Sequence, residues 1–123
     1  MPSSRDSGLS LRDIAEAIDN INHFTESMDF EGFREDLKTI AAVSVKLLVI
    51  SEAAVRLGDA AVAACPGAPW PEIRGIGNWL RHQYDHVDLE AVWNTVQDDL
   101  PPLRAAIANA LRSSTRPNPE SES

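Results

Sequence analysis

The residues of this chain that are best suited to chemistry lie in one stretch, residues 70–88, which holds two of the three Trp, two of the three His and the single Tyr. Read as a helix, at about 100° per residue, this stretch separates its side chains into two faces. One face is largely apolar and consists of Ile73, Ile76, Gly77, Leu80 and Tyr84. The opposite face is polar and consists of Arg74, Asn78, Arg81 and Asp85, with His82 at its edge.

The polar face has the residue types that a phosphate site needs. Arginine offers a planar fork of hydrogen-bond donors, and a histidine with a pKa near ~6.5 can give or take a proton. The same pattern is also typical of an amphipathic helix with a solvated polar side and a histidine without function. By itself the pattern favours this second interpretation, so a functional assignment needs independent support.

Length and charge narrow the class of protein. A chain of 123 residues has room for one hydrophobic core, and its net charge of −8 argues against strong general affinity for nucleic acid or an anionic membrane. The acidic residues gather in the first 36 positions. Residues 37–84 instead carry five basic side chains against three acidic ones, a net charge of +2. The stretch with the arginines and His82 is therefore mildly basic within an acidic protein.

The sequence predicts a cytoplasmic protein without a bound metal or cofactor. Cys65 is the single cysteine, which excludes an intrachain disulfide and fits a reducing compartment. The first ten residues lack the apolar core of a signal peptide, and no apolar run reaches the ~20 residues that span a bilayer. Acidic, histidine and cysteine side chains are not spaced as metal ligands, and His23 and His86 are expected at the surface.

Apolar residues recur at helical spacing along most of the chain, which predicts an all-α antiparallel bundle of four to five helices. Residues 43–50 are rich in Val and Ile and could form a strand, but the length of the apolar pattern favours a helix that is apolar all round and lies in the middle of the bundle. Gly58 should end this helix, and Pro101-Pro102 should kink or divide the last one near Asp99. The expected helices cover residues 10–28, 29–57, 71–85 and 88–111.

The predicted domain covers residues 9–112, with a flexible N-terminus at 1–8 and a disordered tail at 113–123. Over nearly all of this domain the chain resembles the HepT-like proteins of the HEPN superfamily, which are toxins of bacterial toxin–antitoxin pairs. The segments that carry the resemblance are Leu11–Ile14, Ile50–Ala54 with Arg56-Leu57, Pro69–Ile76, Asn78 with His82 and Tyr84, Tyr84–Trp93, and Asp99–Leu103.

The resemblance implies a metal-independent endoribonuclease of a type VII-like toxin–antitoxin pair, with RNA rather than DNA as substrate. The family motif is an arginine, usually an asparagine, three residues, a histidine, one residue and a tyrosine. Asn78, His82 and Tyr84 match it, whereas Gly77 stands where the arginine belongs. Arg81 is expected to replace that arginine, with Arg74 as the other candidate. A homodimer would bring two copies of His82 to one cleft, as acid and base. We expect its interface to include residues 70–88, because Gly75 and Gly77 let another backbone approach closely.

The resemblance also implies a cognate nucleotidyltransferase antitoxin that attaches AMP to Tyr84. The added nucleotide would bring bulk and negative charge next to His82 and so exclude RNA. Two alternatives stay open from the sequence. One is a catalytically degenerate family member that only binds a partner or a nucleotide, which Gly77 favours. The other is a helical bundle that dimerises and has no activity of its own.

Overall fold

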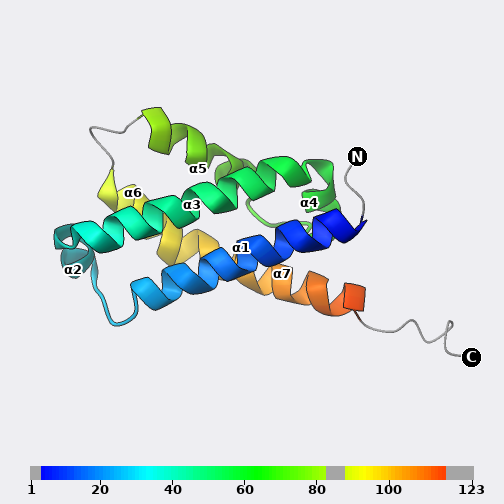
Figure 1. Ribbon diagram of the computed structural model, residues 1–123, viewed down its shortest axis with the longest axis horizontal. Coiled ribbons are helices and arrows are strands. Elements are labelled where there is room, and N and C mark those ends of the chain that lie inside the picture. The colour runs from blue at the N-terminus through cyan, green and yellow to red at the C-terminus, as the bar shows by residue number, and fades with distance from the viewer. Residues whose placement is uncertain (1–3, 83–87, 116–123) are drawn as a thin grey trace, which may run out of the picture.

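The computed structural model describes the backbone of residues 4–82 and 88–115, and the side chains of residues 6–80 and 88–113. Within these residues no β-strand occurs. The four longest helices are α1 (Ser4–Phe24), α3 (Leu37–Leu57), α5 (Trp70–His82) and α7 (Leu100–Thr115). Figure 1 shows α3 running between α1 and α5 and antiparallel to both, while α7 packs against α1. The predicted all-α antiparallel bundle is confirmed.

Short helical segments connect the long ones. They are α2 (Phe30–Glu35), α4 (Asp59–Ala64), α6 (Leu89–Asn94) and a π-helical turn at Thr95–Asp99 that leads into α7. The π-helical turn lies directly before Pro101-Pro102, where a break was predicted. Proline has no N–H to donate to the carbonyl four residues earlier, so the regular hydrogen-bond pattern is interrupted there and the chain passes through a wider turn.

Aspartates begin three of the helices, and two of these starts, at Asp29 and Asp88, were predicted. Asp29, Asp36 and Asp88 each accept a hydrogen bond from the backbone N–H three residues later, at 2.8, 3.0 and 3.1 Å. Asp36 thereby separates α2 from α3, a division that the sequence analysis did not predict. Gly58 ends α3 as expected, with φ of 53°, and its N–H donates to the carbonyl of Ala54.

The ends of α1 and α7 differ from the prediction. α1 begins at Ser4 rather than near Ser10, and α7 continues to Thr115 rather than ending near residue 111. At its other end α1 stops at Phe24, four residues early. The hydroxyl of Thr25 donates to the carbonyl of Ile21 at 2.9 Å, and Ser27 takes a left-handed conformation with φ of 65°. The chain therefore turns toward α2 before Met28.

The core is built from aliphatic residues of the four long helices. Ile14, Ile18, Leu47, Ile50, Ile73, Ile76, Leu100, Leu103 and Ile107 are all buried. α3 is not covered on all sides, contrary to its apolar pattern, because Val45, Val49 and Val55 are 58%, 37% and 60% exposed. These valines lie on the side of α3 that neither α1 nor α5 covers. In the described residues, no helix is long and apolar enough to cross a membrane.

Candidate active site on α5

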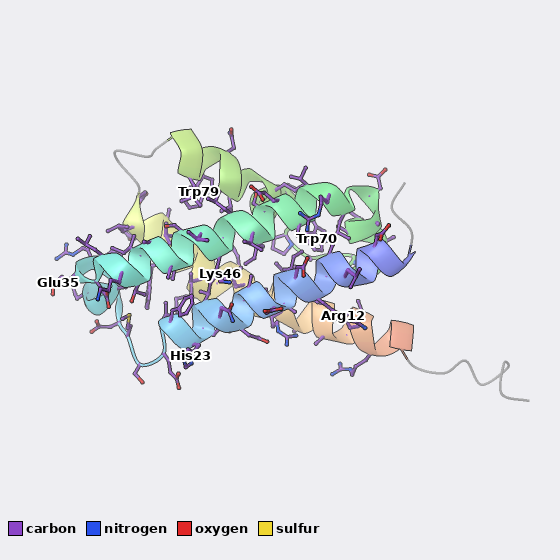
Figure 2. The ribbon with its side chains drawn as sticks, viewed as in Figure 1. Arg12, His23, Glu35, Lys46, Trp70 and Trp79 are labelled. Carbon is purple, nitrogen blue, oxygen red and sulfur yellow. The ribbon has the colours of Figure 1, made fainter. Side chains whose placement is uncertain are left out.

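α5 is held in place by its first residue and its apolar face. Trp70 is 1% exposed, and its indole N–H donates to the carbonyl of Cys65 at 3.0 Å. Ile73, Ile76 and Leu80 are buried, as the helical pattern predicts, whereas Asn78 is exposed. Trp79 is half-buried against the core (Figure 2). The apolar face thus packs inward and Asn78 faces the solvent.

A serine of α3 fixes the position of α5. Ser51 is 3% exposed, and its hydroxyl donates to the carbonyl of Arg74 at 2.9 Å while accepting from the N–H of Gly77 at 3.1 Å. Gly77 is buried at this contact. Gly77 therefore contacts α3 of the same chain through the Ser51 side chain. Its predicted part in an interface between two chains stays a prediction.

Gly75 lacks any such contact within the described structure. A Cβ atom placed at Gly75 would meet nothing within 4 Å. Packing inside the chain therefore gives no reason for a glycine at this position, and the predicted approach of a second copy at Gly75 stays a prediction.

Arg74, one of the two candidates for the missing arginine, is bound to the end of α3. Its Nη2 donates to the carbonyl of Gly58 at 2.6 Å, and its Nε lies 3.4 Å from the carbonyl of Ala54. The last carbonyls of a helix have no partners within the helix and carry partial negative charge. A guanidinium at this end donates hydrogen bonds to these carbonyls and offsets their charge. Arg74 therefore stabilises the junction of α3 and α5, with its Nε and Nη2 directed at the end of α3.

The exposed side of α5 borders a surface pocket of about 280 Å³. The pocket lies between α3 and α5, and Asn78 contributes to its wall. Its lining residues are Ser51, Glu52, Val55, Arg56, Arg74, Gly77 and Asn78. The residues that line it include an asparagine, a glutamate and two arginines together with Val55, so the pocket has both polar and apolar walls.

The remaining predicted site residues are placed only in part. Residues 78–82 are helical, so Asn78 and His82 lie one turn apart along the same helix, as expected. The side chains of Arg81 and His82 lie outside the described ones, and Tyr84 and His86 lie outside the described residues altogether. His23, predicted at the surface, is 79% exposed at the end of α1 and lies 3.4 Å from Glu26 (Figure 2).

The α3 side of the pocket was not predicted from the sequence. Ser51, Glu52 and Arg56 all line it, and they come from the segment Ile50–Leu57 that carries part of the family resemblance. The signal was therefore present in the sequence. Its meaning depends on which faces of α3 and α5 meet, and spacing within a single helix does not give this. Among the described residues, no group of three or more His, Cys, Asp or Glu could hold a metal ion.

Comparison with known proteins agrees with this arrangement. The family described as Ribonuclease HepT-like matches residues 14–110. A protein of Thermococcus cleftensis named "Probable ribonuclease HepT" is 39% identical over 94 residues, which cover 76% of this chain and 86% of that protein. A protein of Methanocaldococcus jannaschii named "Putative RNase" is 30% identical over 105 residues, covering 85% of this chain and 96% of the relative. No solved structure matches the chain. From residues 14–110 and the similarity to these relatives, the chain belongs to the ribonuclease HepT-like family.

Proposed function

We propose that this protein is the toxin of a toxin–antitoxin pair, a metal-independent endoribonuclease that acts as a homodimer in the cytoplasm. The observation that carries the proposal is the helical turn from Asn78 to His82 at the end of α5, next to the polar pocket between α3 and α5. Membership of the ribonuclease HepT-like family supports cleavage of RNA as the chemistry.

The chemistry requires three groups. Cleavage of RNA through its own 2′-hydroxyl needs a base for that hydroxyl, an acid for the leaving oxygen, and positive charge on the phosphate. One His82 cannot act as base and acid in the same step, so a dimer with both copies at one cleft supplies the pair. Asn78 would orient the phosphate or the imidazole by a hydrogen bond. We assign the charge to Arg81, because Arg74 is occupied at the carbonyls of α3.

The proposed partner is a nucleotidyltransferase antitoxin that attaches AMP to Tyr84. Tyr84 follows His82 by two residues, so a nucleotide there would place a negatively charged group close to the imidazole. Intact-mass analysis after co-expression with the partner tests this step. A mass increase of one AMP that is lost in Tyr84→Phe is expected, and an increase that persists in that variant would contradict the assignment.

A second candidate function is favoured by one observation. Gly77 occupies the position of the family arginine, and its N–H is bonded to Ser51 in a buried contact between helices. A family member without that arginine could retain only the binding of its partner or of a nucleotide. The two candidates differ in whether the purified protein cleaves RNA.

The decisive experiment measures RNA cleavage by the purified protein in the presence of a chelator. Cleavage by the wild type and its loss in His82→Ala and Arg81→Ala, each still folded and dimeric by sedimentation, support the proposal. Activity that is absent in the wild type and is created by Gly77→Arg would establish the degenerate alternative. A wild type that sediments as a monomer at micromolar concentration and still cleaves RNA would refute the shared active site.

A further inference from the structure

Arg56 is a cation in the candidate site that neither the family motif nor the pattern on α5 includes. It lies near the end of α3 and lines the pocket to which Asn78 contributes. Its side chain is 56% exposed. Among the described side chains, the pocket has two cations, Arg56 and Arg74. Because Arg74 donates to the carbonyls of Gly58 and Ala54, Arg56 is the better placed of the two to meet an anion from solution.

The present partner of Arg56 holds it weakly. Its Nη2 lies 3.7 Å from a carboxylate oxygen of Asp13 on α1, which is longer than a good hydrogen bond, and Asp13 is equally exposed. Ion pairs of this kind contribute little to stability because water and salt screen them. A phosphate that entered the pocket could therefore draw the guanidinium away from Asp13 at little cost, and it would gain a planar, bidentate donor.

The packing of the two helices fixes where along α5 this cation acts. α3 and α5 are antiparallel, with Ser51 at Gly77 and with Ala54 and Gly58 at Arg74. Ser51 bonds to the backbone of Arg74 and Gly77, so Arg56, five residues later on the antiparallel helix, lies at least as close to the start of α5 as Arg74. The eight residues from Arg74 to His82 cover about 12 Å of helix at 1.5 Å per residue. Arg56 therefore lies toward the opposite end of α5 from His82 and cannot hold the same phosphate as a catalytic group next to His82.

We propose that Arg56 binds a phosphate of the RNA strand that neighbours the one being cleaved, so that the strand runs along the groove between α3 and α5. The inference rests on the proposed ribonuclease function and extends its site from α5 to α3. Glu52, one turn before Arg56, lines the same pocket, so replacing its carboxylate by an amide should favour a phosphate at Arg56.

If Arg56 binds a flanking phosphate, its loss should change KM, kcat and the salt dependence of RNA binding in a defined way. Loss of Arg56 should weaken RNA binding and raise KM while changing kcat by less than about twofold, since the group binds the strand without acting on the reacting atoms. Each lost contact to a single-stranded phosphate lowers the slope of log affinity against log salt by about 0.7. A role in folding alone would leave this slope unchanged.

The test uses the full chain in the His82→Ala background, with binding of a single-stranded RNA oligonucleotide measured by fluorescence anisotropy at several salt concentrations. Arg56→Ala should reduce the salt slope by about 0.7 for each engaged copy of Arg56, and Arg56→Lys should largely preserve it. Glu52→Gln should tighten binding. Arg34→Ala is the matched control, because Arg34 is 52% exposed on α2 and pairs with Glu31 outside the pocket.

The outcomes separate this inference from the proposed function. An Arg56→Ala slope equal to that of Arg34→Ala, when the wild type cleaves RNA, refutes the flanking contact and leaves the ribonuclease assignment intact. A reduced slope, when the wild type does not cleave RNA, supports the contact and refutes the enzyme. Absence of both RNA binding and RNA cleavage in the wild type overturns both. Circular dichroism and melting of Arg56→Ala check that its fold is unchanged.

Discussion

Replacing Arg74 by alanine should destabilise the protein and leave RNA cleavage nearly intact. The hydrogen bond from Nη2 to the carbonyl of Gly58 is 2.6 Å long and involves a charged donor, which is worth about 1.5–3 kcal/mol. The bond from Nε to Ala54, at 3.4 Å, adds little. The positive charge at the end of α3 adds about 0.3–1 kcal/mol. Because the side chain is only half-buried, we expect a loss of about 2–3 kcal/mol, toward the lower part of the combined range.

This loss is measurable by thermal unfolding. For a domain of this size, 1 kcal/mol corresponds to about 4 °C in melting temperature, so Arg74→Ala should melt about 8–12 °C below the wild type. Arg74→Lys keeps the charge but offers no planar fork, so its melting temperature should fall between the two. Arg34→Ala removes an exposed arginine from a surface pair and should shift the melting temperature by less than about 4 °C.

Cleavage measured well below the melting temperature separates the structural role of Arg74 from a catalytic one. Arg74→Ala should retain RNA cleavage within about threefold of the wild type, because the guanidinium is directed at α3. A variant that melts within about 2 °C of the wild type and loses more than tenfold in cleavage would refute this reasoning. The guanidinium would then act on RNA, and the capping bonds to α3 would be dispensable.

Three further predictions follow from burial and charge in the same structure. Phe33→Ala should cost about 3–5 kcal/mol in urea unfolding, because Phe33 is fully buried and its ring centroid lies 5.2 Å from that of Trp93. Burial raises the pKa of the Cys65 thiol, so a thiol-specific chromogenic disulfide should react slowly with the native protein at pH 8 and rapidly in denaturant; equal rates would contradict this. Burial and the charges of Asp98 and Glu72 raise the pKa of Asp99, so the folded state holds the proton of Asp99 more tightly than the unfolded state does. The folded state therefore loses stability as the pH rises from the ordinary pKa of 3.8 through the raised one. Asp99→Asn should therefore be more stable than the wild type at pH 7 and equal to it below the ordinary value of 3.8.

The sequence predicts the elements of the fold well wherever one residue decides the local structure. Asp29, Asp88, Gly58 and the Pro101-Pro102 pair each act through their own backbone or through the next turn, and each has the predicted effect. The open face of α3 was not predicted. Its valines are as apolar as the buried ones, and only the three-dimensional packing of α1 and α5 decides which of them is covered.

The candidate site, like the fold, could be predicted only in part from the sequence. Periodicity correctly separates the buried face of α5 from exposed Asn78, because both follow from a single helix. It gives no information on Arg74, which lies on the polar face of the pattern but reaches across to the end of α3. It also misses Arg56, whose relevance depends on a pocket built by two helices that are separated in the chain by residues 58–69. To predict which charged side chains act between two helices, the register between those helices must be known.

One serine sets the register between α3 and α5. The Ser51 hydroxyl donates to the carbonyl of Arg74 and accepts from the N–H of Gly77. With the helices joined in this way, Arg74 reaches the end of α3 and Arg56 lines the pocket. In the proposed function, positive charge for a phosphate comes from Arg56 on α3 and from Arg81 at the end of α5. An RNA strand lying between these two arginines would cross the Asn78–His82 turn, where the proposed chemistry takes place.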